Sequence, residues 1–125
     1  RVLPDDTVCV VVELANLSQI NTAYGRECGN AMLAQFAGFL KEASATCGTV
    51  YYNGGQQFIG FFDQCRIEDA ESFADYFHRL ITAYNAESTE ATYEYAIGIA
   101  ESKASNAYSI RALLREALRS RTRQE

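Results

Sequence analysis

The most unusual side chains of the sequence lie on a glycine turn between two aromatic runs, VYYNGGQQFIGFF, at residues 50–62. Two neutral amides, Gln56 and Gln57, follow the glycine pair Gly54 and Gly55. Tyr, Phe, Val and Ile favour strands, and glycine supplies the positive φ that a tight hairpin turn requires. An amide donates and accepts hydrogen bonds without carrying charge, so a site at this hairpin tip has to work without charge from the turn.

A strand that is apolar on both faces is expected beside this hairpin. Residues 7–14 read TVCVVVEL, with apolar side chains at even and odd positions alike, and Cys9 is expected to be buried. Such a strand belongs in a central sheet that is covered on each side. The acid Glu13 interrupts the apolar run near its C-terminal end.

The rest of the chain alternates between helical and strand-like patterns. The apolar spacing predicts helices over residues 17–24, 29–44 and 68–84, a strand over 92–100 with close backbone packing at Gly98, and a last helix capped by Ser109. This order of elements predicts an α/β fold, in the form of an α+β sandwich with a hairpin inside its sheet.

Composition and charge exclude several classes of protein. The 125 residues suffice for one domain, and a net charge of -5 argues against nucleic acid as a partner. No apolar run is long enough to span a membrane. The chain starts at Arg1 without Met, so we expect it to be cut from a longer protein. Four cysteines form no CxxC pair and the single His78 has no partner spacing, so we expect free thiols in a reducing cytoplasm and no zinc site.

Four blocks of the sequence, in order and correctly spaced, resemble the GGDEF domains of diguanylate cyclases. They are ELANLSQINTAYGRECGNAML at residues 13–33, NGGQQF at 53–58, YAIGIA at 95–100 and LLREAL at 113–118. The resemblance implies a palm-like fold with a mostly antiparallel central sheet and flanking helices over residues 1–125. It also implies the chemistry of the family, in which two facing protomers convert two GTP molecules to cyclic di-GMP with Mg²⁺ held by carboxylates.

The acidic positions of the family are largely replaced in this chain. The first metal-binding Asp of the family falls on Glu13 and the second on Ala15, while the acidic third and fourth positions of GGDEF fall on Gln56 and Gln57. A neutral amide compensates poorly for the dehydration of Mg²⁺. The motif is thus a degenerate GGQQF, in which Glu13 is either a relic metal ligand or a solvated acid at a strand end, and the two glutamines are favoured as neutral turn residues.

The positions that read guanine in the family are half retained. Its Asn falls on Asn21 and its Asp on Asn30, where an amide accepts with only one oxygen and presents an NH₂ to a donor. Asn21 either reads a base or ties a loop to the backbone. The Arg and Asp of the family's inhibitory site fall on Ala45 and Gly48. Its phosphate-binding cations have no secure match, although Arg119, Arg121 and Arg123 lie nearby.

These departures favour a catalytically inactive domain that serves as a regulatory or protein-interaction module in bacterial cyclic di-GMP signalling, with no catalytic residue and no cofactor expected. Its partners would be neighbouring domains or other signalling proteins, and a homodimer is an option. One alternative is a GTP-binding allosteric domain that controls a neighbour such as an EAL phosphodiesterase domain. A second is an active diguanylate cyclase. The expected location is the cytoplasm, including the cytoplasmic part of a membrane-anchored sensor.

Overall fold

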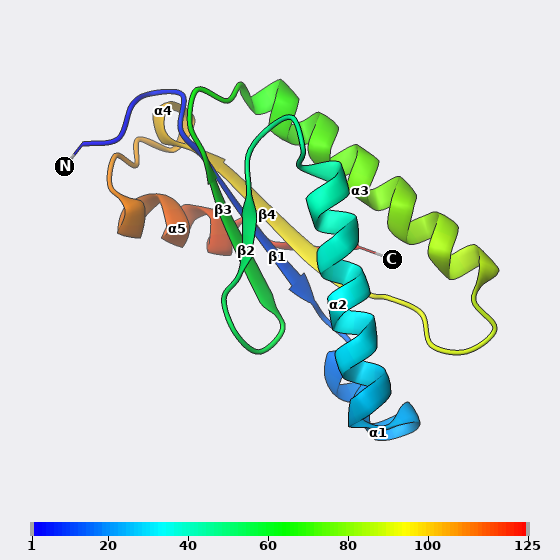
Figure 1. Cartoon of the computed structure of the whole chain (residues 1–125). Coiled ribbons are helices and arrows are strands. Elements are labelled where there is room, and N and C mark those ends of the chain that lie inside the picture. Colours follow the sequence, from blue (N-terminus) through cyan, green and yellow to red (C-terminus); the bar gives the residue numbers. More distant parts are fainter. Residues whose placement is uncertain (1, 125) are drawn as a thin grey trace.

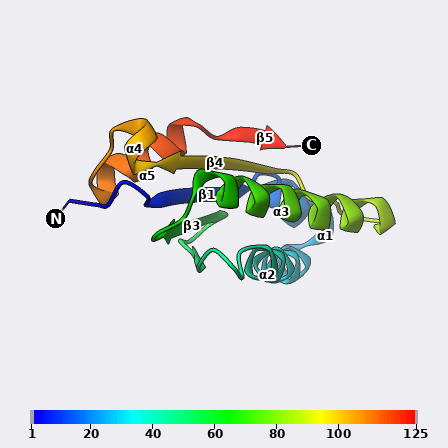
Figure 2. The ribbon, with the colours of Figure 1, turned by 90° about the horizontal axis from the view of Figure 1, so that it is seen from above.

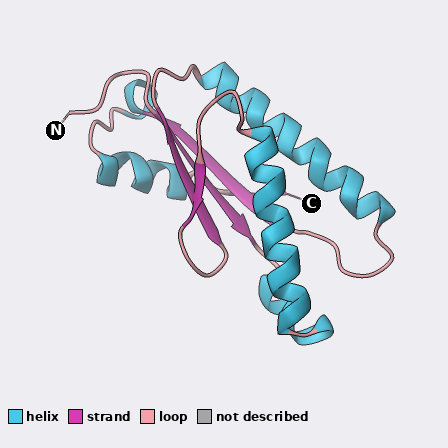
Figure 3. Cartoon of the chain, viewed as in Figure 1, coloured by secondary structure: helices cyan, strands magenta, loops and turns pink. Residues whose placement is uncertain are grey.

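A computed structural model describes residues 2–124, which form a single sheet with helices on both of its faces (Figures 1 and 3). The elements in chain order are β1 (Val8–Leu14), α1 (Leu17–Tyr24), α2 (Arg26–Ala43), β2 (Val50–Tyr52), β3 (Gln57–Phe62), α3 (Ile67–Glu87), β4 (Tyr95–Glu101), α4 (Ser102–Ser105), α5 (Ile110–Arg119) and β5 (Thr122–Gln124). The strand order is β2-β3-β1-β4-β5, and every neighbouring pair is antiparallel. The predicted fold class is confirmed.

Strand β1 lies at the centre of the sheet and pairs with β3 on one edge and β4 on the other. Its side chains alternate between two cores, as the sequence predicts. Val8, Val10, Val12 and Leu14 belong to the larger core under α2 and α3. Cys9 and Val11 belong to a smaller core under α4 and α5. Figure 2 shows α2 and α3 on one side of the strands and α4 and α5 on the other.

Several element boundaries differ from the sequence-based prediction. Helix α2 begins at Arg26 rather than residue 29, because Gly25 at φ +92 separates it from α1 without an intervening loop. Helix α3 extends to Glu87, and β4 begins at Tyr95 rather than residue 92. The predicted cap is confirmed, since the Ser109 hydroxyl accepts from the Ala112 amide at 3.1 Å. The short α4 and the polar β5 were missed because neither has an apolar period.

All four cysteines are free thiols, as expected, and two of them are buried. Burial raises the pKa of the Cys9 thiol to about 12, and burial is also the main reason that the pKa of Cys65 rises to about 11. A raised thiol pKa keeps both groups protonated and unreactive at neutral pH. Both therefore act as small apolar residues of the core.

Gly98 lets helix α5 approach the sheet closely, as the sequence suggested. A Cβ built on Gly98 of β4 would lie 2.0 Å from the carbonyl oxygen of Ala117 in α5. A contact this short with backbone atoms forces the helix away from the strand. Gly98 therefore fixes the depth at which α5 sits, and with it the position of the chain that follows α5.

We expect Gly98→Ala to lower the free energy of unfolding by about 1–3 kcal/mol, because the added methyl overpacks the α5–β4 contact. Gly38→Ala is the matched control, since nothing lies within 4 Å of its added Cβ in the middle of α2. That control should raise stability by about 0.5–1 kcal/mol. Urea denaturation of both variants checks the pair, and equal effects would contradict the close packing at Gly98.

Candidate functional site

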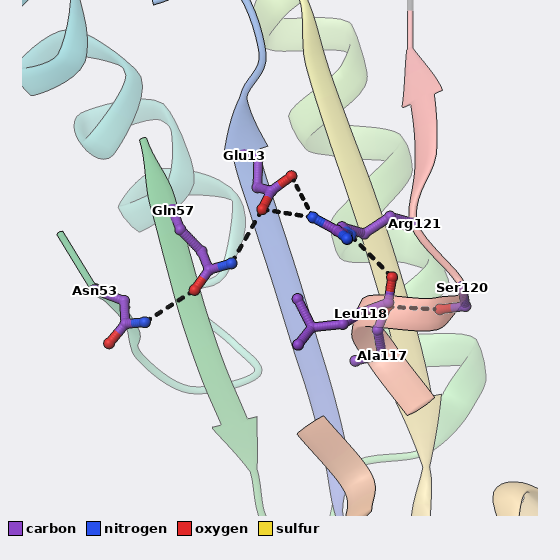
Figure 4. A network of polar contacts seen from close by, with 7 residues as sticks. All are labelled: Glu13, Asn53, Gln57, Ala117, Leu118, Ser120 and Arg121. Atoms are coloured by element: carbon purple, nitrogen blue, oxygen red, sulfur yellow. Dashed lines mark hydrogen bonds and ion pairs between the residues drawn. The ribbon is translucent and has the colours of Figure 1, made fainter. Parts of the chain in front are cut away.

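A row of four polar side chains crosses one end of the sheet (Figure 4). The Asn53 side-chain NH₂ donates to Oε1 of Gln57 at 2.9 Å, and Nε2 of Gln57 donates to Oε2 of Glu13 at 3.0 Å. On the far side of Glu13, Nη1 of Arg121 lies 2.8 Å from both carboxylate oxygens. This row joins the hairpin, the central strand and the segment before β5, and we refer to it as the Glu13 row.

The register of the sheet and the end of α5 place these groups together. Glu13 and Gln57 are directly paired residues of β1 and β3, so their side chains lie on the same face. That face also carries Cys9 and Val11, because alternate residues of a strand share a face. Arg121 follows the end of α5, where its Nε donates to the Leu118 carbonyl at 2.8 Å and so holds the guanidinium toward Glu13.

The charge of Glu13 is balanced within the protein. The Glu13 side chain is only 16% exposed, whereas the Arg121 side chain is 40% exposed. A shielded carboxylate needs a cation and hydrogen-bond donors, and Arg121 with Gln57 supplies both. The solvated-acid interpretation of Glu13 is therefore wrong, because its carboxylate lies in a closed polar network.

The residues around Glu13 do not fit a magnesium ion. Both oxygens of Glu13 already face the Arg121 guanidinium, and a second cation there would be repelled. Gln56 is exposed and uncharged, and Ala15 has no donor side chain, so neither supplies a carboxylate beside Glu13. Within residues 2–124, no group of three His, Cys, Asp or Glu side chains could hold a metal ion.

The hairpin tip is open and its glycines serve the turn. Gly54 and Gly55 have φ values of +91 and +58, which favour glycine, and both are exposed. The Gln56 carbonyl accepts from the Leu14 amide at 2.9 Å, while its side chain makes no hydrogen bond within the described chain. Gln56 thus fits the neutral turn residue that the sequence favoured, whereas Gln57 is a member of the Glu13 row.

The two asparagines expected to read a base lie apart from the Glu13 row, on α1 and α2. Oδ1 of Asn21 is buried and has no hydrogen-bond partner among the described residues, and it rests against Gly29, where an added Cβ would lie 1.7 Å away. Asn30 is exposed and lines a cavity of about 390 Å³ with Leu33, Tyr52 and Phe58. Asn21 thus lies on α1 and Asn30 on α2, directly after Gly29 in the sequence.

Asn16, which was not among the predicted site residues, connects the end of β1 to the loop before β4, a role that Asn21 does not fill. Its NH₂ donates to the Thr92 carbonyl at 2.8 Å, and its Oδ1 accepts from the Glu94 amide at 2.9 Å. The loop-tying role proposed for Asn21 is therefore wrong. Asn is favoured directly before a helix such as the one that begins at Leu17, but the Asn16 side chain makes no capping hydrogen bond there, so that preference does not predict its contacts.

A second cavity, of about 780 Å³, lies where the inhibitory site was expected. Ala45 and Gly48 line it, together with Lys41, Glu42 and Thr49. Among the described residues that line it, the charged side chains are one cation and one anion, and none is an arginine. Those residues therefore offer no guanidinium with which to bind a phosphate or a guanine edge.

Comparison with known proteins identifies the fold and the family. The family model described as "Diguanylate cyclase, GGDEF domain" matches residues 4–122. An EAL/GGDEF domain protein from M. capsulatus has a solved structure with a TM-score of 0.76 and 21% identity, covering 92% of this chain and 75% of that one. Comparison with curated protein sequences returned no match.

Two Pseudomonas aeruginosa structures are similar as well. The isolated GGDEF domain of YfiN, also called TpbB, gives a TM-score of 0.79 at 21% identity over 92% of this chain and 69% of that one. The diguanylate cyclase SiaD, solved with its activator SiaC, gives a TM-score of 0.68 at 17% identity over 94% of this chain and 48% of that one.

Across residues 2–124, none of the helices is both long and apolar enough to cross a bilayer.

We expect a double-mutant cycle on Glu13→Gln and Arg121→Gln to give a coupling energy of about 1 kcal/mol, because the pair is shielded and held by further hydrogen bonds. The matched control is the Arg66–Glu68 pair, whose side chains are 76% and 59% exposed, and its coupling should lie near zero. Chemical denaturation measures all variants. Coupling near zero in the Glu13–Arg121 cycle would show that this pair does not stabilise the fold.

Proposed function

The chain belongs to the GGDEF domain family, and from that premise we propose that it makes no cyclic di-GMP and serves as a regulatory or protein-interaction module in cyclic di-GMP signalling. The observation that carries this proposal is the ion pair between Glu13 and Arg121. In the family, the position of Glu13 supplies a metal ligand for phosphoryl transfer. Here its carboxylate is neutralised by a cation of the chain itself.

The amide at Gln57 supports the same proposal. Its NH₂ lies 3.0 Å from the Glu13 carboxylate, so an acid at this position would set two carboxylates side by side with one arginine to balance them. The amide instead donates to one neighbour and accepts from another. Gln57 thus suits a closed structural network, and the degenerate GGQQF motif is consistent with a site that has lost its chemistry.

A nucleotide-binding allosteric domain is the second candidate, and one observation favours it. The buried Oδ1 of Asn21 has no partner among the described residues, and an unsatisfied acceptor costs about 1–3 kcal/mol. An N–H group of a bound base would satisfy that acceptor once the Asn21 side chain turned away from Gly29. The exposed amide of Asn30 is the weaker half of such a site, because it accepts with a single oxygen.

Location and partners follow from the family. We infer a cytoplasmic domain that acts on a neighbouring domain or a separate signalling protein, and not on nucleic acid. Relatives of similar fold are consistent with both arrangements, since one is an EAL/GGDEF domain protein and another was solved with an activator protein.

The purified domain should form no cyclic di-GMP from GTP with Mg²⁺ or Mn²⁺, because the positions of the catalytic acids carry Gln56, Gln57 and Ala15. Chromatography of the reaction mixture is the measurement, with an active GGDEF domain as the positive control. Product above the enzyme-free background that disappears in Glu13→Gln would overturn the proposal. Circular dichroism of Glu13→Gln establishes that any such loss is not caused by unfolding.

GTP binding should be weak, with affinity near the millimolar range. The losses at Gln56 and Asn30 each cost about 1–3 kcal/mol, which together weaken a micromolar site by roughly 10²- to 10⁴-fold. Titration of a fluorescent GTP analogue measures this, and Asn30→Asp with Gln56→Glu should recover part of the affinity.

A matched control adds the same charge elsewhere, through Asn106→Asp with Gln19→Glu at exposed positions, and should recover nothing. Low-micromolar binding by the unmodified domain that depends on Mg²⁺ and weakens in Asn21→Ala would promote the allosteric candidate over the interaction module.

A further inference from the structure

Helix α5 carries a row of arginines on its outer side. Arg111, Arg115 and Arg119 are four residues apart and exposed, so they form one stripe along the helix. Arg119 pairs with Glu116 at 3.3 Å. Within residues 2–124, neither Arg111 nor Arg115 makes an ion pair. Two unpaired guanidinium groups therefore face solvent on adjacent turns.

This stripe lies in the one strongly basic part of an acidic chain. Residues 103–123 contain six of the eleven basic residues and one of the sixteen acidic residues, which gives +5 against -10 for the remainder. Solubility alone does not require such a separation of charge. A concentrated positive surface on an acidic protein selects an acidic partner and steers its approach.

An apolar sheet surface lies beside helix α5. Helix α5 packs over β1 and β4, so the β2–β3 half of the same face extends beyond it. Ile59 and Phe61 of β3 are half-buried at the border of the small core, and Tyr51 of β2, which is paired with Ile59, is 68% exposed. Large apolar side chains therefore continue from the core to the edge of the sheet.

The flank of α5 adds a wall to this surface. Leu114 and Leu118 border the small core with Ile59 and Phe61, and Figure 4 shows the Leu118 side chain pointing toward β1. Ile110 precedes them by one helical repeat and is 58% exposed. We call the whole the α5 surface, made of Tyr51, Ile59, Phe61, Leu114 and Leu118 with Arg111, Arg115 and Arg119 along its rim.

We propose that the α5 surface docks an acidic amphipathic helix of a partner protein or domain. The leucine flank and the arginine rim run parallel along α5, and the arginines span eight residues, or about 12 Å. A helix with one apolar row and acidic residues at i, i+4 and i+8 presents the complementary pair of rows. Such a partner covers the apolar strip and neutralises the arginines together.

The alternative occupants fit this surface less well. A second copy docked through the same surface would bring two arginine rims together, and like charges oppose such an interface. A bilayer would need a continuous row of protruding apolar side chains, whereas Ile59 and Phe61 are half-buried and lie between the exposed Tyr51 and the helix. The proposal deepens the proposed interaction function by naming its partner, and the two are tested separately, since the cyclase assay does not involve this surface.

The test uses a synthetic helical peptide of about 20 residues with a leucine row and glutamates at i, i+4 and i+8. Fluorescence anisotropy should show binding that weakens as salt is raised. The charge reversals Arg111→Glu with Arg115→Glu should weaken it at least about tenfold, and Tyr51→Ser about threefold or more. The control Lys41→Glu with Arg79→Glu reverses two exposed charges elsewhere and should leave affinity unchanged.

Three outcomes would overturn the proposal. The first is equal affinity for a peptide with lysine in place of every glutamate. The second is equal loss of binding in the reversal and control variants, whose folding circular dichroism verifies. The third is self-association in sedimentation, or binding to phosphatidylserine vesicles, that is lost in the Arg111→Glu, Arg115→Glu variant while that variant still binds the peptide. A domain that made cyclic di-GMP and still bound the peptide would contradict only the pseudoenzyme proposal.

Discussion

Burial of β1 on both faces and pairing along both of its edges set the constraint on which the other elements depend. Because β1 has no solvent-facing side, α2 and α3 must cover one face and α4 and α5 the other. Any polar side chain on this strand must then be satisfied from within the protein. Glu13 is the one charged residue of β1, and the Glu13 row supplies the cation and the hydrogen-bond donors that its carboxylate needs.

The Glu13 row joins parts of the chain that are far apart in the sequence. Gln57 reaches Glu13 through the hairpin pairing, and Arg121 reaches it because Gly98 allows α5 to lie close to β4 and so places the helix end beside β1. A divalent ion and an arginine solve the same electrostatic problem for a buried carboxylate. The arginine is part of the chain, so it neutralises the carboxylate at all times. It cannot polarise a phosphate as a metal ion does.

Much of the fold was predictable, and the site only in part. The even and odd apolar positions of β1, the glycine hairpin and the Ser109 cap are local signals that sequence periodicity carries. The contact between Glu13 and Arg121 joins residues 108 apart, and no local pattern encodes it. The place of Asn16 directly before a helix is a local signal, but its partners lie at residues 92 and 94, and no local pattern indicates them. The loop-tying interpretation of Asn21 failed because its Oδ1 rests against Gly29, which leaves space but offers no donor.

The two ends of α5 have different tasks. Its C-terminal end places Arg121 beside Glu13, and the resulting ion pair neutralises one positive charge of the basic segment. Arg111 and Arg115, on the exposed side nearer its start, are not needed for that network and remain unpaired within the described chain. A charge that no internal contact requires adds self-repulsion within the basic segment. Recognition of an acidic partner beside the apolar sheet edge accounts for that charge and for the neighbouring exposed tyrosine together.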